Sequence, residues 1–226
     1  MTGQWIVEHS HGDAGAFHRR TPAPMRSATF HTVGQPTLVL GSAQSVDDVD
    51  AAVAHALGVE VVQRRSGGGA VLLVPGEFVW LDLVVPADDP LWRADVAQAM
   101  VWVGEVWVDA LASFGIEGEV HRQALAPSAW SRQVCWTGLG TGEVVGAVTA
   151  AGRAKLVGVS QRRTRAWARF QSMCHLRWRP ELVAALVAPP RPDPAALADV
   201  AATVSVPAAD QTAALATALV TALLRR

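Results

Sequence analysis

Short apolar runs separated by turn residues fill the first part of the chain. They predict strands at residues 37–40, 59–63, 71–74 and 78–85. The last two runs flank Pro75-Gly76, a pair typical of a β-hairpin turn. In the run 78–85 the odd positions are all apolar and should face the core, which places Asp82 on the opposite, surface or site-facing side.

Apolar residues at helical spacing follow these strands. Ser45 is a suitable N-cap for a helix that ends at Gly58, and a long helix is predicted from Asp89 or Pro90 to Phe114. The buried stripe of the long helix would comprise Val96, Met100, Val103, Trp107, Ala110, Leu111 and Phe114. Further strands are predicted at 116–120, 143–148, 155–161 and 168–177, with a tight turn at 150–153, and helices at 181–187 and 210–223.

The length of 226 residues and the half-apolar composition fit one large domain with a single core. Residues 1–34 show little periodicity and are expected to form a lead-in to the regular pattern of residues 35–188. Residues 189–226 begin with a proline-rich connector and end in an amphipathic helix. We expect this C-terminal part to pack on the same domain, because it is too short to form a second one.

Composition excludes several classes of protein. The net charge of −1 argues against a strongly basic nucleic-acid-binding protein. Two cysteines, Cys135 and Cys174, form neither a disulfide framework nor a metal-ligand spacing. No secretory signal opens the chain, and no apolar run reaches the ~18 residues that span a membrane. The expectation is a cytoplasmic protein without a metal site, a membrane anchor or a nucleic-acid partner.

Lys155 is the only lysine in a chain with 18 arginines. Lysine supplies a compact ammonium with a tunable pKa, which arginine cannot replace, so its presence suggests that an amine is needed. It lies in a stretch, residues 144–180, that contains no Asp or Glu. The cations of this stretch, which either attract an anion or form a solvated face, are Arg153, Lys155, Arg162, Arg163, Arg165, Arg169, Arg177 and Arg179.

Side-chain alternation along residues 155–161 divides this strand into two faces. Lys155, Val157, Val159 and Gln161 should share one face, and Leu156, Gly158 and Ser160 the other. RNA binding through the Arg/Trp-rich segment 162–179 is a further alternative, but no RNP or KH signature accompanies it.

The segment RRSGGGAV, residues 64–71, lies between two predicted strands. Three glycines permit positive φ and close backbone approach, and their consecutive N–H groups can surround one anion as a nest. Arg64 and Arg65 could add bidentate contacts. The spacing is not that of a P-loop, and a flexible hairpin is the alternative interpretation.

Together with KLVGVSQRR at residues 155–163, this motif resembles the lipoate–protein ligase group of the biotin/lipoate ligase and octanoyltransferase superfamily. The resemblance extends over residues 36–187. It implies an α/β (α+β) fold, a mixed β-sheet flanked by helices, with residues 35–188 as the biotin/lipoate protein ligase-like catalytic domain.

The resemblance also implies roles for particular residues. Lys155 matches the family's lysine beside the acyl carbonyl. A substrate-binding set would comprise Arg64, Arg65, Ser66, Gly67, Gly68, Gly69, Ala70, Gly158, Ser160 and Gln161. The implied activity is a lipoate–protein ligase that forms lipoyl-AMP from lipoate and ATP with Mg²⁺. The lipoyl group would then pass to a lysine of a lipoyl-carrier domain, either of a 2-oxoacid dehydrogenase complex or of the glycine cleavage H protein.

Some residues depart from the family's ligase pattern, and these departures favour functions other than ligation. Ligases usually follow the glycines with a His, an Asp and an Asn, whereas this chain has Leu72, Leu73 and Val74 and then Pro75-Gly76. Cys135 precedes Trp136, as a cysteine precedes an aromatic residue in one octanoyltransferase type. Cys135 is therefore either the nucleophile of an octanoyl or lipoyl transferase supplied by acyl carrier protein, or a small buried hydrophobe. A non-catalytic acyl- or nucleotide-binding homologue is a third hypothesis.

Overall fold

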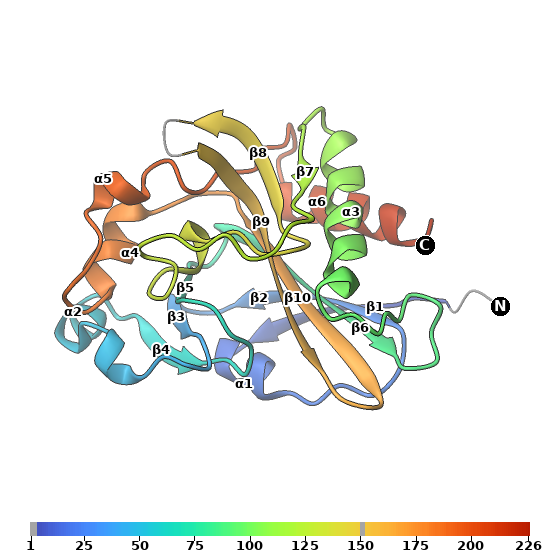
Figure 1. Ribbon diagram of the computed structural model, residues 1–226, viewed down its shortest axis with the longest axis horizontal. Helices are drawn as coiled ribbons and strands as arrows, with labels where there is room; N and C mark the ends of the chain where they lie inside the picture. The colour runs from blue at the N-terminus through green and yellow to red at the C-terminus, as the bar shows by residue number, and fades with distance from the viewer. Residues whose placement is uncertain (1–3, 150–151) are drawn as a thin grey trace.

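The computed structural model describes residues 4–149 and 152–226. Its strands form a seven-stranded sheet in the order β1-β2-β6-β10-β9-β8-β7 and a three-stranded sheet in the order β4-β3-β5. Helices α3 and α6 lie together on one side of β9 and β10, and the small sheet lies on the other side with α1 and α2 (Figure 1). The mixed sheet flanked by helices confirms the predicted fold class.

The large sheet is mostly antiparallel, with β1 parallel to β2. Its strands are β1 Ile6–Gly12, β2 Ser27–Val33, β6 Phe78–Pro86, β7 Glu119–Val120, β8 Val144–Thr149, β9 Gly152–Arg163 and β10 Trp167–His175. Part of the turn predicted at 150–153, between β8 and β9, lies outside the described residues. In β6 all residues from Phe78 to Val85 are buried, because both faces of this central strand are covered.

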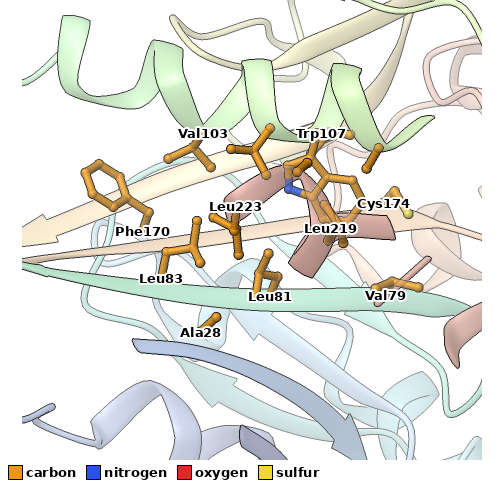
Figure 2. Packing of buried hydrophobic residues seen from close by; sticks show 14 of the residues in the cluster. Ala28, Val79, Leu81, Leu83, Val103, Trp107, Phe170, Cys174, Leu219 and Leu223 are labelled. Atoms are coloured by element: carbon orange, nitrogen blue, oxygen red, sulfur yellow. The ribbon is translucent and has the colours of Figure 1, made fainter. Parts of the chain in front are cut away.

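Two helices cover one face of the large sheet, which we call the helix-covered face. They are α3, Gln98–Ala112, and α6, Gln211–Leu223. Val103 and Trp107 of α3 point down to Phe170 of β10 and Leu81 of β6 (Figure 2). The odd positions of β6 lie in this core, as the alternation predicted.

The opposite face, which we call the pocket face, is covered by the small sheet and by short helices. The small sheet contains β3 Thr37–Leu40, β4 Glu60–Gln63 and β5 Val71–Leu73. The remaining helices are α1 Ala14–Arg19, α2 Ala51–Ala56, α4 Pro180–Leu186 and α5 Pro194–Leu197, with 3-10 turns at Val46–Asp48 and Cys135–Thr137. The segment 45–58 is thus a short turn followed by α2 rather than one helix.

The predicted hairpin of residues 71–85 is wrong. β5 pairs with β3 in the small sheet, whereas β6 pairs with β2 and β10 in the large one. The Pro75-Gly76 turn therefore carries the chain from one sheet to the other. A local turn signal cannot show which partners the two flanking strands take.

The long helix also begins later than predicted, at Gln98 instead of Asp89 or Pro90. Asp89 accepts hydrogen bonds from the Arg26 guanidinium and from the Leu91 N–H. The carboxylate that satisfies the first free N–H group of the helix belongs to Asp95, which accepts from Gln98 N at 2.9 Å. Val96 precedes the helix and is exposed, so it is not part of the buried stripe.

A β-bulge in β9 corrects the predicted alternation. Val144 of β8 lies opposite Val157, but Val145 lies opposite Lys155, so Leu156 has no partner on β8. Leu156 and Val157 both contact the helix-covered core. Lys155 and Gly158 consequently both reach the cavities on the pocket face, where regular alternation would have separated them.

In the described part of the chain, no helix is long and apolar enough to cross a membrane.

Candidate active site

An apolar pocket lies between the two sheets. Val39, Val71 and Leu73 of the small sheet face Gly158 and Met173 of the large one across it. The pocket shares four lining residues with a wider, more polar groove, and these are Cys135, Glu143, Val159 and Ser160. The groove is also lined by Lys155 and by Gly67, Gly68 and Gly69, so the two sequence motifs meet at one cavity.

The Arg64 guanidinium fixes the glycine loop from within. It is buried and donates hydrogen bonds to the carbonyls of Val39, Gly67 and Gly69 at 2.8–3.1 Å. Burial lowers the pKa of Arg64, and the adjacent Cys135 and Glu143 oppose this effect. Because the guanidinium is occupied by three carbonyls, Arg64 holds the shape of the loop.

The glycines allow the loop to lie directly against the segment that carries Cys135. A Cβ on Gly69 would come within 2.7 Å of Val134 N and 2.8 Å of Cys135 N. Ala70 N donates to Gln133 O, and Cys135 N donates to Ala70 O. Gly68 has φ +94°, and a Cβ there would lie 3.4 Å from Cys135 Sγ. The triglycine is thus what places the thiol at the junction of pocket and groove.

The N–H groups of Gly67, Gly68 and Gly69 have no hydrogen-bond acceptor among the described residues. Three successive N–H groups beside a groove are suited to hold an anion or a developing oxyanion.

The Lys155 ammonium is buried and paired with a carboxylate. Its side chain is 3% exposed, and Nζ lies 2.8 Å from Glu143 Oε2 and 3.0 Å from Cys135 O. Glu143 also accepts hydrogen bonds from Gly140 N and Val159 N, which fixes its orientation. The thiol of Cys135 and the amine of Lys155 therefore belong to one locally fixed assembly.

The backbone of Lys155 is held by the C-terminal part of the chain. Lys155 N donates to Val200 O, and Ala202 N donates to Lys155 O, both at 2.9 Å. The Trp136 indole also donates to Lys155 O. A Cβ on Gly158 would lie 3.1 Å from the Trp136 ring, so a side chain there would make the indole shift.

Comparison with known proteins identifies the family. The family described as the lipoyl protein ligase A/B catalytic domain matches residues 16–195, which is most of the chain. The chain belongs to this family. Its members attach or transfer lipoyl or octanoyl groups, so the family is enzymatic.

One curated relative in the family is the octanoyltransferase LipM of Carboxydothermus hydrogenoformans, which is 36% identical over 93 residues. That match covers 40% of this chain and only 34%, about a third, of the relative's length.

Two solved structures show the same fold. The bipartite lipoate protein ligase of Thermoplasma acidophilum, described with its E2 lipoyl domain, superposes with a TM-score of 0.73 at 16% identity. It covers all of this chain and 83% of that chain. A lipoate-protein ligase A bound with ATP superposes with a TM-score of 0.72 at 14% identity, covering all of this chain and 85% of that chain.

Within this lipoyl ligase fold, four residues of the predicted substrate-binding set line neither the pocket nor the groove, and these are Arg65, Ser66, Ala70 and Gln161. Arg65 is exposed and does not line either cavity. Gln161 lies opposite Phe170, which belongs to the helix-covered core, so its side chain is on the wrong face of β9. Both of its buried amide atoms lack a partner among the described residues. Ser66 and Ser160 do meet, with their hydroxyls 3.2 Å apart.

Sequence reasoning missed Glu143 and His18. Glu143 directly precedes the acid-free stretch, and its pairing with Lys155 depends on the antiparallel register of β8 and β9. His18 of α1 lines the apolar pocket, stacks on Trp80 and bonds to Gln171. Burial lowers the pKa of His18 to about 4, despite the opposing charge of Asp82, so the ring is neutral at neutral pH.

Asp82 belongs to a buried polar network on the pocket face. Its carboxylate accepts hydrogen bonds from Arg169, His31, the Trp80 indole and Gln171. Burial alone would raise the pKa of Asp82, but the charge of Arg169 and the hydrogen bond from His31 hold it well below its usual range. The network supports Gln171 and Trp80, which line the pocket.

The cations of residues 144–180 are not one exposed face. Five of the eight pair with acids from elsewhere in the chain: Arg153 with Glu119, Lys155 with Glu143, Arg169 with Asp82, and Arg177 and Arg179 with Glu77. These acids lie outside residues 144–180, so the ion pairs could not be predicted from the stretch itself.

Proposed function

We propose that this chain is an acyltransferase that carries an octanoyl or lipoyl group as a thioester on Cys135 and delivers it to a lysine of a lipoyl-carrier domain. The observation that carries the proposal is the position of the Cys135 thiol. It lies where an apolar pocket, suited to an acyl chain, opens into a polar groove beside a buried amine.

In the first step, the sulfur of Cys135 attacks the carbonyl carbon of a donor thioester such as acyl carrier protein provides. A new carbon–sulfur bond forms, the bond to the donor sulfur breaks, and the donor leaves as a thiol with the proton given up by Cys135. The Arg64 guanidinium and the Lys155 ammonium offset the charge on the attacking sulfur.

In the second step, the neutral amine of the acceptor lysine attacks the Cys135 thioester. An amide forms, the carbon–sulfur bond breaks, and the amine's proton returns to Cys135. In both steps an oxyanion develops beside the sulfur, where Lys155 and the N–H groups of Gly67, Gly68 and Gly69 can stabilise it. Glu143 orients the ammonium.

Two features favour transfer over ATP-dependent ligation. Leu73 and Val74 stand in place of the His and Asp that ligases usually carry there, and Leu73 is a buried apolar side chain. The curated relative is named an octanoyltransferase.

Ligation remains the second candidate, because solved structures of the same fold include one bound with ATP. In that reaction the acyl carboxylate would attack the α-phosphorus of ATP, presented with Mg²⁺, to give acyl-AMP and pyrophosphate. The acceptor amine would then displace AMP. Lys155 and the glycine N–H groups suit a phosphate as well as an oxyanion.

The deciding assay follows acylation of a lipoyl-carrier domain by intact mass, either with an octanoyl thioester alone or with lipoate, ATP and Mg²⁺. Transfer should need only the thioester and should fall on the order of 10³-fold or more in Cys135→Ala. The matched control is Cys174→Ala, which should retain activity, because burial raises the pKa of the Cys174 thiol to about 12 and keeps it protonated. Acylation that requires ATP and survives Cys135→Ala would establish the ligase instead.

A further inference from the structure

Several arginines of β9 and the β9–β10 turn are left over from the ion pairs of this region, and they lie where β9 passes into the turn to β10. After the five ion pairs of residues 144–180 are set aside, Arg162, Arg163 and Arg165 have no acidic partner among the described residues. Arg65, from the glycine loop, also has none. We call these four residues the arginine rim.

The rim is assembled from two segments beside the proposed acyl pocket. Arg162 lies two positions after Ser160 on β9, and Ser160 is bonded to Ser66, the neighbour of Arg65. Arg162 lies opposite Arg169 in the ladder, yet Arg169 is neutralised by Asp82. The Ser66–Ser160 contact thus brings the glycine-loop segment that carries Arg65 beside the end of β9 that carries Arg162.

The rim is held in place without acids. Arg163 lies opposite Ala168, on the helix-covered side of β9. Its guanidinium donates to the carbonyls of Arg93 and Ala94 and lies over the Trp92 ring at 4.2 Å. Arg162 lies over Trp167 at 5.6 Å, and its buried Nη1 has no partner among the described residues.

Like charges raise the electrostatic potential of this edge. Burial, followed by the charges of Arg65 and Arg169, lowers the pKa of Arg162. The chain as a whole is nearly neutral at −1, so the excess positive charge is local. A local field of one sign favours association with a surface of the opposite sign and says little about small neutral ligands.

We propose that the arginine rim docks an acidic face of the acceptor protein and so directs the acceptor lysine to the acylated Cys135. This rests on the proposed function for the identity of the acceptor. A protein is favoured over a small anion because the rim extends from the glycine loop to the β9–β10 turn. Two of its members, Arg65 and Arg165, are exposed on the surface.

The test separates docking from chemistry by using a donor without charge. Octanoyl-N-acetylcysteamine acylates Cys135, and a lipoyl-carrier domain rich in acidic residues is the acceptor. The double variant Arg65→Gln/Arg165→Gln changes exposed side chains only, and Arg162→Gln removes the central charge. The control is Arg225→Gln, an exposed arginine just beyond α6, which packs on the helix-covered face.

We expect the rim variants to raise the KM for the acceptor domain about 3- to 10-fold and to weaken its salt dependence. The rate of Cys135 acylation and the Arg225→Gln variant should be unchanged. An unchanged KM for the acceptor domain overturns the proposal. So does a result in which the rim variants slow the reaction only when the octanoyl group is supplied on acyl carrier protein. If no thioester acylates Cys135 in the unaltered protein, the proposed function has failed rather than the docking surface.

Discussion

The two faces of the large sheet are built from the same strands but differ in the kind of side chain that they bury. On the helix-covered face, Leu81 and Leu83 of β6 pack against α3 and α6 in an apolar core. On the pocket face, the intervening Asp82 is equally buried but is surrounded by Arg169, His31, Trp80 and Gln171. The comparison shows that the helix-covered face stabilises the protein by burying apolar side chains. On the pocket face, a network of buried, hydrogen-bonded polar groups holds the residues that line the pocket.

Apart from the loss of Cys135 itself, the largest effect should come from Lys155→Arg, which keeps the positive charge but not the geometry of the ammonium. The planar guanidinium is larger than the compact ammonium, which lies 2.8 Å from Glu143 Oε2 and 3.0 Å from Cys135 O. We expect acyl transfer to fall about 10²- to 10³-fold, the usual consequence of losing one oxyanion donor. Single-turnover rates measure this, and rates equal to those of the unaltered protein would remove the amine from the mechanism.

The next effect concerns Asp82→Asn on the pocket face. It leaves the Arg169 charge buried without its counterion, so the free energy of unfolding should fall by about 3–5 kcal/mol. Denaturant titration measures the change. The matched variant Leu83→Ala lies on the helix-covered face and should lower the free energy of unfolding by about 2–5 kcal/mol.

These two variants should differ in function. Leu83→Ala should leave the acylation rate of the folded protein unchanged, whereas Asp82→Asn should alter it by releasing Gln171 and Trp80 from the pocket wall. Equal effects of both variants on the rate would contradict the division between the faces.

A smaller effect is expected from Gly69→Ala. The added Cβ must push Val134 and Cys135 away from the loop, which should cost about 1–3 kcal/mol of stability. Gly67→Ala is the comparison, since a Cβ there meets nothing within 4 Å. Thermal unfolding distinguishes the two, and equal melting temperatures would show that the loop does not pack tightly on the Cys135 segment.

The last effect is a slope in stability with pH, and it arises from the pocket face. Burial lowers the pKa of His175 to about 3 and that of His18 to about 4, against an ordinary value of 6.5. Between about pH 6.5 and 4 the unfolded chain binds protons that the folded chain does not. The free energy of unfolding should therefore fall as pH falls, by about 1.4 kcal/mol per pH unit for each histidine.

His175→Phe checks this slope, because it keeps a ring between Trp136 and Trp178 without a titrating group. The variant should flatten the pH dependence by about half. An unchanged slope in urea titrations at pH 4.5–6.5 would mean that His175 is not buried as neutral imidazole.

The sequence contained much of the fold but only the local part of the site. Alternation in β6 and the helical spacing of residues 98–112 depend on neighbouring positions, and both are seen in the structure. The fold class and the family are confirmed. The roles predicted for Lys155, Cys135 and the glycine loop remain predictions.

The predictions that were wrong concerned features that depend on partners distant in sequence. The bulge at Leu156 arises from pairing with β8, so alternation alone placed Lys155 on the face opposite Gly158. The counterions of Arg169 and Arg179 lie 87 and 102 positions away, at Asp82 and Glu77. A stretch without acids of its own was therefore mostly neutralised by distant acids, and its three remaining arginines form the arginine rim together with Arg65.

The central claim, that Cys135 carries the acyl group, is tested most directly without an acceptor. The protein is mixed with octanoyl-N-acetylcysteamine, quenched in acid and examined by intact mass and peptide mapping. The account predicts a single octanoyl adduct on Cys135 that disappears as fast as product forms once a lipoyl-carrier domain is added. Acylation of that domain without any adduct on Cys135, or with the adduct on Cys174, would contradict it.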